Sequence, residues 1–590
     1  MPESSPTEST ITGHGGRHAV AAATAHGVTT MFTLSGAHVF PLYDAAVTRH
    51  PPLRIVDVRH EQTAVFAAEA TAKLTRTPGL AVLTAGPGVT NGISAITSAW
   101  FNGSPVVVVG GRAPAARWGS GALQELDHPP LVASVTKSAS TIFAAEAIGS
   151  GIDDALRLAS TAHRGPVFLD IPMDVLFSES TAPATWVVPD TTGSRPVAPG
   201  REPDPSDLDE IARLLGESRH PVLVLGSDVW TDDAVVEARR FVDAAGIPVI
   251  ANGMGRGILA PNHPLLVTRA RSQAFGQADL VIVAGTPLDF RLSYGNFGGR
   301  DGSAPANVVH LVDSPTQFAA VRTRAFRTSS GAVGNPLFGG AAENARQPPA
   351  ASAAGDLRLV FTGLLTTWGE LVRQPDYSAW AEELRQTANA AVARDAVDLD
   401  SNRDPIHPAR VYRELINRLE SDAIVAGDGG DFVSFAGRYL EPAQPGGWLD
   451  PGPYGCLGTG LGYAAAARLA RPSAQVALLL GDGAAGFSLM DVDTLVRHDL
   501  PAVMIVGNNG AWGLEKHPMR FLYGYDVAAE LRQETRYDEV VKALGGAGET
   551  VARPTDIGPA LDRAFASRVP YLINVLLDPD IAYPRTTTGV

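Results

Sequence analysis

The amino-acid sequence predicts an α/β protein made of three consecutive doubly wound parallel-sheet domains. Short apolar runs of strand length alternate with Ala-rich stretches of helical length along most of the chain. Such runs are typical of parallel strands that helices cover on both faces. The chain of 590 residues is also too long for one hydrophobic core. Two polar stretches rich in Pro, Gly and Ser, about 181–207 and 328–355, divide the pattern into three blocks.

The expected strands fall into three groups, one for each block. In the first block, Leu80–Thr84 and Val106–Gly110 are expected to be buried strands, with Asn91–Trp100 as a helix between them. The second group comprises Val222–Gly226, Pro248–Ala251, Leu280–Gly285 and Val308–Asp313, and the third comprises Ala423–Gly427, Val476–Gly481, Val503–Asn508 and Tyr571–Leu577. We therefore expect a disordered N-terminus (1–11), domains over 12–185, 205–371 and 400–577, and a C-terminal tail or lid (578–590).

Composition and charge exclude several classes of protein. Hydrophobic residues make up 45% of the chain and charged residues 18%, which is typical of globular proteins. The formal net charge of −15 argues against nucleic acid or an anionic membrane as a partner. Residues 1–16 lack the apolar segment of a signal peptide, and the single cysteine, Cys456, cannot form an internal disulfide. We expect a cytoplasmic protein.

The most specific motif is Gly481-Asp482-Gly483, which is followed after 24 residues by Asn508-Asn509. Each half follows an expected strand, so both should reach the carboxyl edge of one parallel sheet, where such folds bind ligands. Carboxylate and amide oxygens suit Mg²⁺, and glycines allow a diphosphate to approach the backbone. Either half alone is a common turn, but the pair at this spacing predicts a metal–diphosphate site.

This pattern resembles the thiamine-diphosphate family that includes acetolactate synthase, benzaldehyde lyase, oxalyl-CoA decarboxylase and 2-hydroxyacyl-CoA lyase. The resemblance covers nearly the whole chain after about residue 12. It implies a pyrimidine-binding, a middle and a diphosphate-binding domain, in that order. It also implies that Asp482, Asn509 and the backbone carbonyl of Ala511 bind Mg²⁺.

A second family motif, Arg59-His60-Glu61-Gln62, follows the apolar run Arg54–Val58. The resemblance implies that Glu61 bonds the pyrimidine ring of the cofactor and drives the proton transfer that activates it. A carboxyl group in a mostly apolar pocket can have its pKa moved toward this task. A lone Glu after a strand is otherwise a solvated charge. However, residues 86–91 and Gln124 also match family positions, which favours catalysis.

Two glycine-rich loops complete the expected cofactor site. The loop 427–431 follows a strand, and its amides are expected to hold the diphosphate, with an ordinary turn as the alternative. The loop 455–462 resembles a dinucleotide fingerprint, but the family implies that Leu457, where synthases usually carry Met, wedges between the two thiamine rings. The expected cofactor-binding residues are Glu61, Gly429, Gly430, Asp431, Gly455, Leu457, Gly481, Gly483 and Asn509.

Further residues are assigned to the substrate by resemblance. The segment 34–38 resembles the Gly-Ala-His of benzaldehyde lyase, whose imidazole faces the substrate, so His38 is a candidate proton shuttle beside Gln124 and Glu61; a structural histidine is the alternative. Trp512, Leu514 and His517 are expected pocket walls. Asp493 is expected either to pair with Arg497, one helical turn later, or to influence the cofactor pocket.

The middle block has no catalytic motif but resembles the acyl-CoA branch, which binds an adenine nucleotide such as ADP here. The implied nucleotide or CoA residues are Arg271, Arg291 and Asp313, with surface ion pairs as the alternative. The preferred function is therefore a 2-hydroxyacyl-CoA lyase that releases formyl-CoA and an aldehyde or ketone. The alternative is acetolactate synthase, which would also be expected to bind FAD, and a remote one is a non-catalytic regulatory homologue. The family implies a homodimer or homotetramer with shared active sites.

Overall fold

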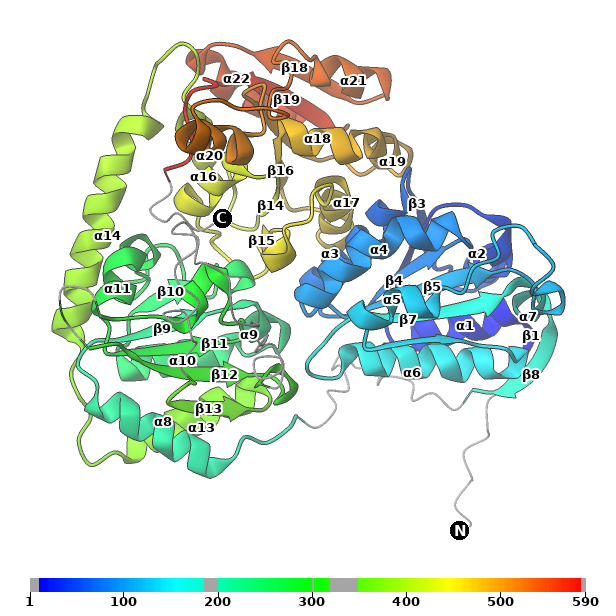
Figure 1. The fold of residues 1–590 in the computed structure, drawn as a ribbon, viewed down its shortest axis with the longest axis horizontal. Helices are drawn as coiled ribbons and strands as arrows, with labels where there is room; N and C mark the ends of the chain where they lie inside the picture. The colour runs from blue at the N-terminus through cyan, green and yellow to red at the C-terminus, as the bar shows by residue number, and fades with distance from the viewer. Residues whose placement is uncertain (1–9, 185–199, 300–301, 303, 319–347, 585–590) are drawn as a thin grey trace.

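The computed structural model describes residues 10–184, 200–299, 302, 304–318 and 348–584. Three parallel sheets form the centres of three α/β domains (Figure 1), so the predicted fold class is confirmed. The first domain lies beside the third, and the middle domain lies below the third in this view. Among the residues described, no helix has the length and apolar character needed to cross a membrane.

The first domain contains a six-stranded sheet in the order β3-β2-β4-β5-β7-β6. Apolar side chains of α1, α2 and α6 pack on one face of the sheet, and those of α3 and α4 pack on the other. The strands are β2 (Thr30–Thr33), β3 (Arg54–Asp57), β4 (Gly79–Leu83), β5 (Val106–Arg112), β6 (Ser138–Thr141) and β7 (Val167–Pro172). The helices are α1 (Gly15–Ala25), α2 (Phe40–Thr48), α3 (Glu61–Thr75), α4 (Pro87–Phe101), α5 (Pro129–Val132), α6 (Ile148–Ser160) and α7 (Met173–Phe177).

The N-terminus differs from the expectation at two residues. Thr10 and Ile11, expected to be disordered, belong to strand β1 (Thr10–His14). This strand pairs antiparallel with β8 (Glu179–Pro183) at the other end of the domain, and the ladder supplies backbone hydrogen bonds that the sequence pattern does not reveal. The rest of the expected tail, residues 1–9, lies outside the described part of the chain.

The middle domain has a five-stranded parallel sheet in the order β10-β9-β11-β12-β13. Helices α8, α10 and α13 cover one face, and α11 together with α14 covers the other. The strands are β9 (Pro221–Leu225), β10 (Val249–Ala251), β11 (Leu280–Ala284), β12 (Asn307–Val312) and β13 (Ala351–Ala354). The helices are α8 (Pro205–Glu217), α9 (Ser227–Thr231), α10 (Val235–Ala245), α11 (Arg271–Gln277), α13 (Leu357–Glu370) and α14 (Ser378–Leu399), which leads to the third domain.

The third domain repeats the pattern, with strand order β15-β14-β16-β17-β19-β18. Its strands are β14 (Ile424–Asp428), β15 (Trp448–Leu449), β16 (Val476–Gly481), β17 (Val503–Asn508), β18 (Ala547–Val551) and β19 (Tyr571–Leu576). Its helices are α15 (Pro408–Ile416), α16 (Asp431–Tyr439), α17 (Gly460–Ala470), α18 (Asp482–Ser488), α19 (Val492–Arg497), α20 (Gly513–Tyr523), α21 (Tyr537–Ala543) and α22 (Pro554–Ala566).

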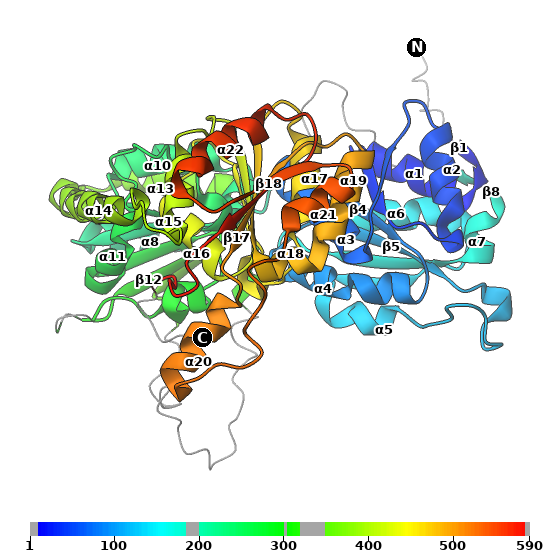
Figure 2. The same cartoon turned by 90° about the horizontal axis from the view of Figure 1, so that it is seen from above.

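Helices α3 and α17 join the first and third domains into one continuous hydrophobic core, and both views place them at the contact between these domains (Figures 1 and 2). The contact is close because a methyl group added to Gly462 would lie 2.9 Å from the carbonyl oxygen of Thr63. The Tyr463 hydroxyl lies 3.1 Å from both the Glu69 carboxylate and the Lys73 amine. These contacts hold α3 along its length against α17 of the third domain.

Candidate functional site

The two halves of the predicted metal motif meet at the carboxyl edge of the third sheet. Gly481 at the end of β16 is paired in register with Gly507 of β17. The Ala511 amide nitrogen lies 3.2 Å from both Asp482 Oδ2 and Asn509 Oδ1, so the three expected metal ligands are neighbours. Burial raises the pKa of Asp482 to about 6, although backbone amides partly offset the effect.

The residues of this edge fit a metal-bound diphosphate. Two of the three expected ligands are side chains with hard oxygen donors, and both are more than nine-tenths buried. Glycine is required at this edge because the backbones approach closely there. Gly429 has a φ of +137°, and a methyl group added to it would lie 2.9 Å from the Gly481 amide nitrogen. The buried Thr459 hydroxyl has no hydrogen-bond partner in the structure and could bond a ligand.

Two of the three predicted pocket walls, Leu514 and Trp512, lie next to glycines of this edge. Methyl groups added to Gly430 and Gly483 would lie within 2.6 Å of the side chains of Leu514 and Trp512, respectively. Asp431 begins α16, and its Oδ1 accepts a hydrogen bond of 2.9 Å from the Tyr583 amide. The predicted C-terminal tail therefore folds against α16 as far as it is described, while residues 585–590 lie outside the described chain.

A buried carboxylate that the sequence did not single out holds the Leu457 loop. Asp428, the last residue of β14, is fully buried and accepts hydrogen bonds from the amides of Gly458 (3.1 Å) and Gly460 (2.8 Å). Burial raises the pKa of Asp428 to about 7 despite these bonds. Cys456 in the same loop has its thiol pKa raised to about 11 by burial, which agrees with a small packed residue rather than a reactive thiol.

Glu61 is the first residue of α3 and is buried to more than nine-tenths. Its Oε2 accepts a hydrogen bond of 3.0 Å from Asn91 Nδ2, in the family segment 86–91 of α4. The neighbouring Gln62 faces the Leu457 loop, because a methyl group added to Gly458 would lie 2.9 Å from Gln62 Nε2. One chain therefore brings the Arg-His-Glu-Gln motif next to the glycine-rich loop of the third domain.

Asp491 anchors the start of α3, whereas the sequence pattern indicates Asp493, two residues later, as the candidate. Asp491 accepts hydrogen bonds of 2.7 Å from the Arg59 amide and from the Thr63 hydroxyl. Asp493 pairs with Arg497 at 2.7 Å and with Arg59 at 3.5 Å. Of the two expectations for Asp493, the structure therefore shows the ion pair with Arg497. The sequence signal for Asp491 was only an acid at the start of a helix, which is usually a solvated charge.

His38 and Gln124 lie close together on the first domain. The ring of His38 lies 3.2 Å from the Thr84 hydroxyl and bonds the backbone of Leu123, the residue before Gln124. Burial lowers the pKa of His38, so its imidazole is neutral near pH 7. Gln124 has a φ of +59° and packs against Gly86, since a methyl group on Gly86 would lie 2.8 Å from the Gln124 Cβ.

The three expected nucleotide residues of the middle domain do not gather in one place. Arg271 donates to the carbonyl oxygen of Arg291, which pairs with Asp289 at 2.8 Å. Burial, with the charges of Arg256 and Arg291, lowers the pKa of Arg271 to about 10. Asp313 instead pairs with residues of the first domain, and the sequence pattern at a strand end could not show which domain would cover it.

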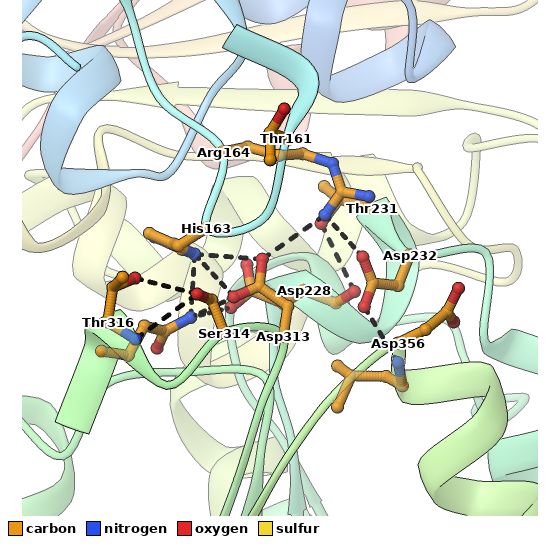
Figure 3. A network of polar contacts seen from close by, with 12 residues as sticks. Thr161, His163, Arg164, Asp228, Thr231, Asp232, Asp313, Ser314, Thr316 and Asp356 are labelled. Carbon is orange, nitrogen blue, oxygen red and sulfur yellow. Dashed lines mark hydrogen bonds and ion pairs between the residues drawn. The ribbon is translucent and has the colours of Figure 1, made fainter. Parts of the chain in front are cut away.

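Asp313 belongs to a buried ionic network between the first and middle domains (Figure 3). Its carboxylate pairs with His163 at 3.0 Å and Arg164 at 3.5 Å, and Arg164 also pairs with Asp232. Burial and the nearby Asp313 raise the pKa of Asp228 to about 7. Burial alone would lower the pKa of His163, but Asp313 raises it to about 9. The His163, Asp228 and Asp313 ligand atoms lie within 4.8 Å, a metal-compatible spacing, yet the network already contains two cations of its own.

The comparisons with known proteins agree with this architecture. Family models for the thiamine pyrophosphate enzymes match in order: the N-terminal TPP binding domain at 14–131, the central domain at 208–331 and the C-terminal TPP binding domain at 428–575. The chain is 47% identical to "Acetolactate synthase large subunit IlvG" of Mycobacterium tuberculosis, over 99% of both chains. It is 33% identical to "2-hydroxyacyl-CoA lyase 2" of Caenorhabditis elegans, over 96% of this chain and 89% of that protein. The human protein of that name is 32% identical, over 92% and 86%. With three matched domains in the same order and relatives that span its full length, the chain belongs to the thiamine pyrophosphate enzymes.

Proposed function

We propose that the chain is a thiamine-diphosphate-dependent lyase that cleaves, or in reverse forms, the C1–C2 bond of a 2-hydroxyacyl-CoA. The products would be formyl-CoA and an aldehyde or ketone. The observation that carries this proposal is His38, a buried imidazole with a lowered pKa beside the Gln124 loop. A neutral imidazole can take the proton of the substrate hydroxyl during cleavage and return it in the reverse direction.

The rest of the site supplies binding and orientation. When bound, thiamine diphosphate supplies a carbon nucleophile and accepts the electrons of the broken bond. Asp482, Asn509 and the Ala511 carbonyl would hold the Mg²⁺, which would offset the negative charge of the diphosphate. Glu61 would exchange a proton with the pyrimidine ring, and Leu457 would set the angle between the two rings. Retention of these residues argues against a non-catalytic homologue.

The second candidate is acetolactate synthase, which joins two 2-keto acids with decarboxylation. It is supported by the relative of that name, which is 47% identical over nearly all of both chains. Glu61 and Asp482 would serve both reactions equally. FAD would accompany this activity, and a yellow colour of the purified protein would favour it. ADP would instead accompany the lyase, with Arg271 and Arg291 as the phosphate-binding residues; Asp313 is already engaged by His163 and Arg164.

We further propose that the enzyme is cytoplasmic and that its working unit is a homodimer or homotetramer with shared active sites. Large apolar side chains are exposed along the Gln124 loop and the helix after it: Trp118 is 43% exposed, Leu123 77% and Leu131 44%. A second copy would cover them, since such clusters usually mark an interface. Sedimentation at the assay concentration tests this, and a fully active monomer would contradict it.

Two experiments test the proposed function. First, the purified protein with thiamine diphosphate and Mg²⁺ is given formyl-CoA with simple aldehydes or ketones, and separately pyruvate, and the products are identified. A 2-hydroxyacyl-CoA supports the lyase, whereas acetolactate supports the synthase.

Second, Glu61→Gln should keep its fold and bind the cofactor but lose about 10²–10⁴-fold in turnover. Near-normal turnover at saturating cofactor would contradict the assigned role of Glu61.

A further inference from the structure

A chain of buried polar groups stands behind the Gly86–Gln124 wall of the candidate site. The Gly86 amide donates a hydrogen bond of 2.9 Å to His128 Nε2, and the other ring nitrogen, Nδ1, lies 2.9 Å from Asp170 Oδ2. Arg112 bonds the same oxygen at 2.9 Å and also bonds Asp127 at 3.0 Å. The side chains of His128 and Asp170 are completely buried.

These contacts determine the tautomer of His128. Because Nε2 accepts the Gly86 amide proton, Nε2 carries no proton of its own. Nδ1 must then carry the ring proton and donate it to Asp170. Arg112 stacks on Trp118, with its guanidinium carbon 3.9 Å from the ring centroid, and balances the charge of Asp170. The ring is therefore held on both sides with its acceptor directed at Gly86.

Gly86 is a sensitive point for such a contact. It has a φ of +58° and directly precedes Pro87, the first residue of α4, so its position sets where the helix begins. Asn91, in the second turn of the helix, donates to the Glu61 carboxylate at 3.0 Å. Gly86 also packs on Gln124, whose own φ of +59° is unusual for a residue with a side chain.

We propose that His128 is a positioning residue for the proposed reaction. Its neutral imidazole fixes the Gly86 amide and, through α4 and the Gln124 loop, aligns the Glu61 carboxylate and the wall that carries His38. The proposal rests on the proposed function only in so far as Glu61 serves the cofactor. A histidine before two prolines carries no sequence signal for this role, because its partners lie 42 residues away on both sides.

Two substitutions separate the two hydrogen bonds of the ring. In His128→Gln, the amide can reach the position of Nε2 and offer an oxygen to Gly86. In His128→Asn, the amide can replace Nδ1 and donate to Asp170, but the Gly86 amide loses its acceptor. His26→Asn is the control, since His26 pairs with Asp153 in the same domain but contacts none of these residues.

The first readout is hydrogen–deuterium exchange of the peptide that contains Gly86, which needs no cofactor. We expect slow exchange in the wild-type protein and in His128→Gln, and fast exchange in His128→Asn. The second readout is turnover with whichever substrates give product, together with thiamine-diphosphate affinity from calorimetry. His128→Asn should lower kcat about 10- to 100-fold with little change in KM, because a small misplacement of catalytic groups has this cost. His128→Gln should recover at least tenfold of that loss.

Three results would overturn the proposal. The first is free exchange of the Gly86 amide in the folded wild-type protein, a result that requires no variant to fold. Alternatively, His128→Asn has wild-type kcat, or both His128 variants lose activity only in proportion to their unfolded fraction. Glu61→Gln is measured in parallel. If it abolishes turnover while His128→Asn has no effect, only the His128 proposal fails, whereas an active Glu61→Gln would refute the proposed function itself.

Discussion

Replacement of Asp428 by alanine should disorder the Leu457 loop and weaken cofactor binding. The carboxylate accepts two buried backbone amides, from Gly458 and Gly460, and it has no exposed surface. Each amide left without an acceptor costs about 1–3 kcal/mol, so the loop should lose about 2–6 kcal/mol. If the loop must become ordered when the cofactor binds, even the lower value corresponds to a loss of about 30-fold in the affinity for thiamine diphosphate.

The assay is calorimetric titration of thiamine diphosphate in the presence of Mg²⁺, combined with thermal unfolding of the cofactor-free protein. Asp279→Ala is the matched control, because Asp279 accepts the amides of Arg219 and His220 in the middle domain. It should lower the melting temperature without changing the cofactor affinity. An Asp428→Ala protein with wild-type affinity and wild-type melting would refute the assignment of this carboxylate to the loop.

Three further outcomes are expected. Asp482→Ala should abolish Mg²⁺-dependent binding of thiamine diphosphate in calorimetry; unchanged affinity would place the metal elsewhere. Asp493→Asn removes an ion pair with Arg497 at the surface, worth about 0–1 kcal/mol, so turnover and melting temperature should hardly change; a large loss of turnover would assign Asp493 to the pocket. Asp228 keeps its proton to about pH 7 when folded but releases it near pH 3.8 when unfolded, so its contribution to stability falls as the pH rises through this window. In Asp228→Asn, the melting temperature should depend less on pH between pH 4.5 and 7.5 than in the wild-type protein. The same pH dependence of the melting temperature in both proteins would contradict the raised pKa.

Most of the fold was predictable because the central strands of a covered parallel sheet are continuous apolar runs between turn residues, whereas edge strands such as β6 (Ser138–Thr141) and β18 (Ala547–Val551) carry no such run and were not predicted. Strands β16 and β17 have the predicted bounds, Val476–Gly481 and Val503–Asn508. The helix expected over 91–100 begins earlier, at Pro87, because proline is well suited to the first turn of a helix. Strand β1 was missed because five residues with a mixed pattern form a strand only through the partner β8.

The contacts between the predicted ligands were foreseeable for the same reason, since parallel topology brings the ends of neighbouring strands to one edge. Asp482, Asn509 and Ala511 follow β16 and β17 directly and are neighbours in the structure. Asp313 also follows a strand, but its partner His163 comes from another domain, 150 residues earlier in the chain. The spacing of residues around one strand cannot predict which other domain packs against that strand.

The same distinction separates what activates the cofactor from what selects the reaction. The metal edge and Glu61 would serve any member of the family, because they act on thiamine diphosphate and not on the second reactant. On the proposed function, the choice between a lyase and a synthase would therefore depend on the wall that carries His38 and Gln124. That wall is shaped by the Gly86 backbone, the strained Gln124 φ and the buried His128, features that arise from tertiary packing. Variants of this wall, rather than of the cofactor motifs, should therefore shift the ratio of the two products.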